Sequence, residues 1–232
     1  MKDIEFIEGI FIKELKNRFL CEIKINDRLF ECHVPFSYRL ANFLELEGKP
    51  VLVKSNITPN VRTRYALVAM PYKRSYLLLN SSFANRVIEE NIHRRRFSFL
   101  RKRKTILKEH HVEGYKADLF INDSSTIVEV KGVISTSRTA IFPKIHSERA
   151  NRQLKALSEL LQKGYKVCYI IVSLNPYVNE IVLDMNSTLF ELFTECQALG
   201  MQAKGFAIKL KENKIVINKE IPLINIGIKD YD

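Results

Sequence analysis

Apolar and polar residues alternate in short runs through about the first seventy positions, and this period of two predicts β-strands. A short helix fits the less regular stretch 39–45. The pattern changes near Pro71, so we expect the chain to have two parts. The strands expected in the first part span residues 4–15, 19–25, 29–35, 50–54 and 65–70.

Beyond Pro71 the apolar residues recur at helical spacing or in continuous runs. Such spacing from Phe83 to Ile92 predicts a helix that Ser81 or Ser82 can cap. Glycines follow two later helical stretches and can end them. The later elements expected are helices at 147–163 and 187–199, and strands at 116–121, 126–131, 167–174, 205–210 and 214–217.

These elements predict an α/β (α+β) chain of two domains. Over residues 1–72, five strands and a small helix can close into a small β-barrel of the oligonucleotide-binding (OB) kind. A plain half-open barrel without a ligand fits the same pattern. Over residues 73–232, the order β-β-α-β-α-β predicts a mixed sheet flanked by helices.

The net charge and the cysteine content indicate the class of partner and the cellular compartment of the protein. The 232 residues carry a formal net charge of +11, which predicts a polyanionic partner, either nucleic acid or an anionic membrane surface. We find no membrane-spanning run, no basic amphipathic anchor and no signal peptide in residues 1–5, so we expect no membrane partner. Four cysteines without a Cys-x-x-Cys pair indicate free thiols in a reducing cytoplasm.

The strongest chemical signal is an expected hairpin at residues 116–131. Two alternating stretches flank an Asn-Asp-Ser-Ser turn, and a two-residue loop would set Asp118 opposite Glu129 and Lys116 opposite Lys131. Those four residues would share one face of the hairpin with Phe120 and Ile127. The opposite, core face would carry Ala117, Leu119, Ile121, Thr126, Val128 and Val130.

Two carboxylates side by side on a sheet repel each other by roughly 0.2–1 kcal/mol, and a divalent cation reverses that sign. Mg²⁺ (or Mn²⁺) binds carboxylate oxygens and activates bound water against a phosphate. Lys131 could position that water or stabilise charge on the phosphate. We therefore predict a metal-dependent nuclease. The alternative is a solvent-facing hairpin whose carboxylates pair with Lys116 and Lys131.

Several segments, taken in order, resemble one known family. They are Asn80, Asn-Arg-Val-Ile-Glu-Glu at 85–90, Ala-Asp-Leu at 117–119, Val-Glu-Val-Lys at 128–131, Ala-Ile-Phe-Pro at 140–143 and Ser-Glu-Arg at 147–149. Together they resemble the sugar fermentation stimulation protein (SfsA) family over nearly the whole chain. The resemblance implies a DNA-binding protein with an N-terminal OB-like domain and a C-terminal domain similar to the PD-(D/E)XK nucleases.

The resemblance also implies roles for individual residues. Asp118 and Glu129 would be the metal-binding carboxylates, and Lys131 the catalytic lysine. Glu89 would be the further acid that such enzymes often place on the preceding helix. Glu90 competes with it, and a surface ion pair is the other interpretation of Glu89.

The chain departs from the family pattern at two places. The polar His-x-Pro-Asn-Thr-Gly-Ser-Met segment of relatives is His-Val-Pro-Phe-Ser-Tyr-Arg-Leu at 33–40, and Lys144 stands where relatives favour an acid. A non-catalytic DNA-binding transcriptional regulator of sugar metabolism is the alternative function. A pure binder has no reason to hold two carboxylates against a polyanion, so we favour the nuclease. The choice of DNA or RNA, and of monomer or homodimer, stays open.

Two basic surfaces are the expected contacts to nucleic acid. Residues 94–108 contain eight Lys or Arg and no acid, and their Phe97 and Phe99 either stack on bases or anchor the core. A second set, Arg149, Arg152 and Lys155, is spaced to share one helix face. The alternative interpretation is that this face is only solvated. The expected contacts are Arg94, Arg95, Arg96, Arg101, Lys102, Arg103, Lys104, Arg149, Arg152 and Lys155.

Overall fold

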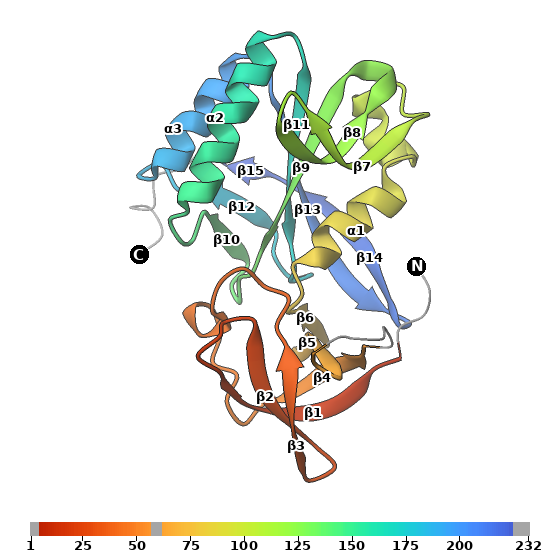
Figure 1. The fold of residues 1–232 in the computed structure, drawn as a ribbon, viewed down its shortest axis with the longest axis vertical. Helices are drawn as coiled ribbons and strands as arrows, with labels where there is room; N and C mark the ends of the chain where they lie inside the picture. Colours follow the sequence, from red (N-terminus) through yellow and green to blue (C-terminus); the bar gives the residue numbers. More distant parts are fainter. Residues whose placement is uncertain (1–4, 57–61, 225–232) are drawn as a thin grey trace.

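The computed structural model describes residues 5–56 and 62–224, which form two stacked parts (Figure 1). The first part is a β-barrel, and the second is a larger sheet with helices on both of its faces. Two expectations lie partly outside the described residues: a first strand that begins at Ile4 and the absence of a signal peptide in residues 1–5.

The barrel is built from the five strands that the alternating pattern predicts. Its strands pair in the order β3-β2-β1-β4-β5, and β3 also pairs with β5 through Cys32–Tyr65 and His33–Ala66. That last pairing closes the barrel, as the OB-like expectation requires. The elements are β1 (Ile7–Glu14), β2 (Leu20–Ile25), β3 (Arg28–His33), the 3-10 helix η1 (Leu40–Asn42), β4 (Pro50–Ser55) and β5 (Tyr65–Tyr72).

A sixth strand, β6 (Ser75–Leu78), has no counterpart in the sequence-based expectation and extends the barrel sheet beside β5. The backbone N–H of Leu78 also donates to the carbonyl of Leu174 in the second part. Hydrogen bonding therefore continues past residue 72. The domain division at residues 72 and 73 stays a prediction.

The second part is a mixed sheet flanked by helices, as predicted. Its six strands have the order β14-β13-β11-β9-β8-β7, with β9, β11 and β13 parallel to one another and the outer strands antiparallel. They are β7 (Ile106–Val112), β8 (Tyr115–Ile121), β9 (Thr126–Val133), β11 (Lys166–Ser173), β13 (Gln202–Lys211) and β14 (Lys214–Ile221). A separate parallel sheet, not expected, contains β10 (Thr139–Phe142), β12 (Glu180–Leu183) and β15 (Leu223–Ile224).

Helices cover both faces of the six-stranded sheet. α1 (Ser82–Asn91) lies on one face, and α2 (Glu148–Gln162) and α3 (Thr188–Ala198) pack together on the other (Figure 1). The hydroxyls of Ser147 and Ser187 cap α2 and α3 by accepting from backbone N–H groups one turn ahead. After the last turns, Gly164 and Gly200 take φ values of 89° and 99°, the left-handed conformation that favours glycine. Both helix ends are therefore as predicted.

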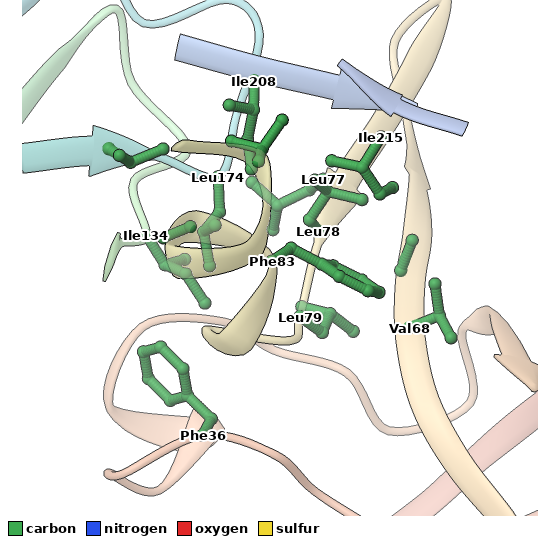
Figure 2. Packing of buried hydrophobic residues seen from close by; sticks show 14 of the residues in the cluster. Phe36, Val68, Leu77, Leu78, Leu79, Phe83, Ile134, Leu174, Ile208 and Ile215 are labelled. Atoms are coloured by element: carbon green, nitrogen blue, oxygen red, sulfur yellow. The ribbon is translucent and has the colours of Figure 1, made fainter. Parts of the chain in front are cut away.

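One apolar core runs through both parts of the chain. Val68, Leu79 and Phe83 meet at the junction between the barrel and α1 (Figure 2). The expected serine cap of α1 is wrong, because neither serine side chain accepts from the first turn of the helix. Instead, the backbone N–H and the hydroxyl of Ser81 both donate to the carbonyl of Pro35, at 3.0 Å. The start of α1 is thereby fastened to the barrel.

Two further findings concern the cysteines and the helices. All four cysteines are free and buried, as predicted. Cys21 and Cys32 are ladder partners in β2 and β3 and carry no disulfide. Within residues 5–56 and 62–224, no helix is both long and apolar enough to cross a membrane.

Candidate active site

The candidate site lies where β8 and β9 separate. Near the turn, Leu119 pairs with Val128 and Ile121 with Thr126, which is the predicted register. The turn itself is the single 3-10 turn η3 (Asn122–Ser124) rather than a two-residue loop. The ladder between β8 and β9 ends at Leu119, so Asp118 is not the ladder partner of Glu129 that we expected.

The carboxylate of Asp118 instead accepts hydrogen bonds from one backbone N–H and from one side chain of α1. Its Oδ2 accepts from the N–H of Val130 at 2.8 Å, and its Oδ1 accepts from Nδ2 of Asn85 on α1 at 2.9 Å. The neighbouring strand β7 is irregular at this level, because Glu109 has a φ of 46°. Burial, and then the charge of Glu129, raise the pKa of the Asp118 carboxyl to about 6 against these hydrogen bonds.

Glu129 is the most deeply buried acid of the site, with 2% of its surface exposed. Its Oε1 lies 2.6 Å from Nζ of Lys131, and its Oε2 accepts from the hydroxyl of Tyr115 at 2.6 Å. Tyr169 on β11 is its ladder neighbour, and the buried Tyr169 hydroxyl has no hydrogen-bond partner within the described ranges. Burial and the charge of Glu129 raise the pKa of both tyrosine hydroxyls.

Lys131 joins the acid pair to α2. Its ammonium donates to Glu129 and also to Oε1 of Gln153 at 2.7 Å, so it is held between a strand and a helix. The structure therefore brings together Asp118, Glu129 and Lys131, the three residues that the sequence selected. The paired-carboxylate alternative fits Lys131, which neutralises Glu129 in this arrangement.

The structure overturns the predicted environment of the hairpin at two points. Lys116 does not face Lys131: its Nζ pairs with Glu109 of β7 at 2.6 Å and lies away from the acid pair. The face expected to be open is also covered, because Phe120 and Ile127 are buried in the core under α2 and α3. Ala117, expected on the opposite core face, joins that same cluster. Glu129 is buried and Lys131 contacts α2, so the acid–lysine set does not lie on an exposed sheet surface.

The two candidate acids on α1 both lie in ion pairs. Glu89 pairs with Lys108 of β7, and Glu90 pairs with Arg86 at 3.3 Å. The α1 side chain that contacts Asp118 is Asn85, one turn before Glu89. Among the residues that the structure describes, no three His, Cys, Asp or Glu side chains form a metal-binding group. A catalytic role for Glu89 stays a prediction.

Two carboxylates still fit a hard cation. Mg²⁺ commonly takes one or two protein carboxylates and keeps several waters, so Asp118 and Glu129 suffice as its acidic ligands. Burial, and then the charge of Glu129, raise the pKa of Asp118, and a bound cation would oppose both effects. Sequence reasoning missed four residues that hold this set: Asn85, Tyr115, Gln153 and Tyr169. Of these only Asn85 stood in a segment that the resemblance picked out.

The predicted basic stretch 94–108 serves more than one purpose. Arg94, Arg95 and Arg96 are exposed and line a cavity of about 420 Å³ beside β14. Nε of Arg103 donates to the carbonyl of Ile92 at 2.8 Å, which occupies part of its guanidinium. The phenylalanine at position 97 is fully buried and packs on the sheet, as the core-anchor interpretation requires.

The basic residues of α2 lie on two adjacent stripes. Arg149 lies one turn before Gln153, so the two side chains share one face of α2, and Gln153 is the residue that contacts Lys131. Arg152 and Lys155 share the stripe of Glu148, whose pKa they help to lower, after His146. Only Arg149 of the three is therefore on the stripe of the acid–lysine set.

The bond from Tyr115 to Glu129 gives a stability prediction. Tyr115→Phe leaves one oxygen of a buried carboxylate without its donor, so we expect the free energy of unfolding to fall by about 1.5–3 kcal/mol. Tyr165→Phe is the matched control, because its hydroxyl meets the exposed carboxylate of Glu113 at 3.3 Å. Urea denaturation measures both. Equal losses in the two variants would contradict a special role for the Tyr115 hydroxyl.

Comparison with known proteins gives matches over both parts of the chain. The family model described as the sugar fermentation stimulation protein RE domain matches residues 82–214, and the SfsA N-terminal OB domain matches residues 15–79. The OB assignment of the barrel is thereby confirmed. The two models divide the chain between residues 79 and 82, at the start of α1.

Relatives and a solved structure cover nearly the whole length. The sugar fermentation stimulation protein homolog of Thermosipho melanesiensis is 28% identical over 221 residues, covering 94% of this chain and 95% of its own. The homolog of Pelagibacter ubique is 26% identical, covering 94% and 97%. A structure of Pyrococcus furiosus SfsA, described as a complex with Ca²⁺, matches with a TM-score of 0.85 at 19% identity, covering 97% and 98%. At that identity the solved structure supports the fold alone.

Proposed function

We propose, from the premise that this chain belongs to the sugar fermentation stimulation protein (SfsA) family, that it is a metal-dependent nuclease acting on DNA or RNA. The observation that carries this proposal is the buried pair of Asp118 and Glu129 beside Lys131. A strand pair that holds two acids and a lysine in one site is the arrangement of PD-(D/E)XK nucleases. The net charge of +11 suits a nucleic-acid substrate.

The proposed metal is Mg²⁺ or Mn²⁺, held by Asp118 and Glu129. The Pyrococcus furiosus relative is described as binding Ca²⁺, another hard cation that takes oxygen ligands. A bound divalent ion supplies two effects: it acidifies a bound water and neutralises charge on the phosphate. Phosphodiester hydrolysis at neutral pH needs both.

The protein side chains hold and orient the reacting groups. Tyr115 keeps one oxygen of Glu129 in place. A cation held by the two acids would compete with Lys131 for Glu129, and the Lys131 ammonium would then be available to the attacking water or the scissile phosphate. Gln153 keeps the ammonium beside the site throughout that exchange, since it accepts from the same Nζ. Arg149, on the same stripe of α2, is placed to meet a neighbouring phosphate.

A second candidate function is a non-catalytic DNA-binding regulator of sugar metabolism on a nuclease-like fold. One observation favours it: Lys131 already neutralises Glu129 at 2.6 Å, so the site holds that acid without a metal. In both cases we propose a cytoplasmic protein, which suits four free buried cysteines. Either oligomeric state, monomer or homodimer, is compatible with both functions.

A cleavage assay separates the two candidates. The purified chain is incubated with end-labelled single- and double-stranded DNA and RNA in Mg²⁺, in Mn²⁺ and in EDTA. We expect shortened products in at least one metal-containing reaction and none in EDTA. Binding of the same oligonucleotides without products under any condition would favour the regulator.

A further inference from the structure

Three basic side chains, those of His33, Lys54 and Arg86, lie where the barrel adjoins α1. His33 on β3 and Lys54 on β4 are both ladder partners of Ala66 on β5. Ladder partners point to the same face of a sheet, so the two cations stand in one row, two strand spacings or about 10 Å apart. Only the methyl group of Ala66 lies between them. Arg86 of α1 lies close enough for its charge to act on Lys54.

The two barrel members of the row are half-buried, and Arg86 pairs with Glu90 of its own helix. Within the described ranges, neither His33 nor Lys54 has an ion pair with a carboxylate. Burial, and then the charge of Lys54, lower the pKa of His33; burial, and then the charge of Arg86, lower that of Lys54. Holding like charges together away from water costs free energy. An anion that enters the row removes that cost.

The same turn of α1 serves both this row and the acid pair. Asn85 holds the carboxylate of Asp118, and the next residue is Arg86, whose charge reaches Lys54. The start of α1 is fastened to Pro35, two residues after His33. A polymer held at Asp118 can therefore continue past α1 onto the barrel.

We propose that His33, Lys54 and Arg86 form a subsite for the phosphodiester backbone, shared between the OB barrel and the catalytic domain. The ligand class rests on the proposed function, because a substrate at Asp118 and Glu129 must run on past α1. Arg86 supplies the planar donor fork that suits phosphate, and Lys54 supplies a point charge. The row lies outside both basic stretches that the sequence singled out.

Binding in EDTA tests the subsite without hydrolysis. Fluorescence anisotropy with labelled single-stranded and duplex oligonucleotides compares the wild type with Lys54→Gln, Arg86→Gln and the double variant. We expect each single change to weaken binding about tenfold and to reduce the slope of log affinity against log salt by about one. Lys54→Arg and Arg86→Lys keep the charge and should recover most of the affinity.

Lys24→Gln is the matched control, because it removes one charge from the same barrel, where Lys24 pairs with the exposed Asp27 at 2.8 Å. We expect its affinity to stay within about twofold of the wild type. Equal weakening in the control, unchanged affinity in the Lys54 and Arg86 variants, or a wild type that binds no oligonucleotide would each overturn the subsite. A chain that binds through the row and never cuts would instead refute the nuclease alone. If Arg86→Gln fails to fold, Lys54→Gln decides the matter.

Discussion

Asp118→Asn, Glu129→Gln and Lys131→Ala are each expected to lower metal-dependent cleavage at least about a thousandfold, or about 4 kcal/mol of transition-state stabilisation. The first two remove a charge that holds the cation, and the third removes the ammonium that Gln153 positions. Single-turnover rates with labelled oligonucleotides measure the effect. Affinity in EDTA should change only a few-fold, because the site binds few of the phosphates.

Asp123→Asn is the control for these variants, since it makes the same chemical change on the same hairpin. Its carboxylate caps the exposed turn, where it accepts from the N–H of Thr105 at 2.7 Å. We expect wild-type cleavage from this variant. A variant lacking Asp118, Glu129 and Lys131 together that still cut at the wild-type rate would show that the chemistry lies elsewhere.

The raised pKa of Asp118 leads to a prediction about stability and pH. An acid whose folded pKa lies at about 6 instead of 3.8 destabilises the fold when it is ionised, so the cost is present above pH 6. The cost shrinks as pH falls below 6 and is gone only below 3.8, where the unfolded carboxyl is protonated too. Without metal, Asp118→Asn should therefore be more stable than the wild type at about pH 8, by on the order of 2 kcal/mol. By about pH 4 that advantage should be gone.

The Asp118→Asn variant also loses one hydrogen bond, and the stability difference expected at pH 8 already includes that loss. Asparagine has a single acceptor oxygen, so it cannot accept from both Asn85 and Val130 as Asp118 does. One lost hydrogen bond costs about 1 kcal/mol. Urea denaturation at the two pH values measures the net effect. A variant less stable than the wild type at pH 8 would mean that the carboxylate serves as a structural ion-pair partner.

Metal bound at Asp118 should stabilise the folded protein, whereas the ionised carboxylate alone destabilises it. Mg²⁺ or Mn²⁺ binds the folded site and hardly binds the unfolded chain, so it raises the melting temperature of the wild type. At a hundred times its Kd the gain is about 2.7 kcal/mol. Asp118→Asn should lose most of that gain, and Asp123→Asn should keep it. A wild type whose melting temperature ignores millimolar Mg²⁺ and Mn²⁺ would count against the metal site.

Local signals in the sequence predicted local structure well. The alternating barrel strands, the extents of α2 and α3 and the glycines after them depend on neighbours within one turn or one strand. The acid–acid–lysine set was also found, because its members lie on one hairpin. The strands β6, β10, β12 and β15 were missed, since runs of two to four residues carry no usable period. The strand β7 was missed because its first residues lie in the stretch 94–108, which we interpreted only as a basic surface.

What the sequence could not predict depends on contacts between distant segments. Whether Asp118 faces Glu129 depends on where the ladder between β8 and β9 stops, and that ladder ends at Leu119. Asn85 and Gln153 reach the site from helices on opposite faces of the sheet. The cationic row needs the closing pairing of β3 with β5, which joins segments more than thirty residues apart. No pattern within a single segment contains these pairings.

The continuous core at Val68, Leu79 and Phe83 bears on how the chain can be divided. A cut between the two family domains would expose large apolar side chains on both fragments, because each part supplies the covering surface of the other. The barrel is therefore not a detachable binding module on a flexible tether. The barrel and the six-stranded sheet should therefore melt in one cooperative transition.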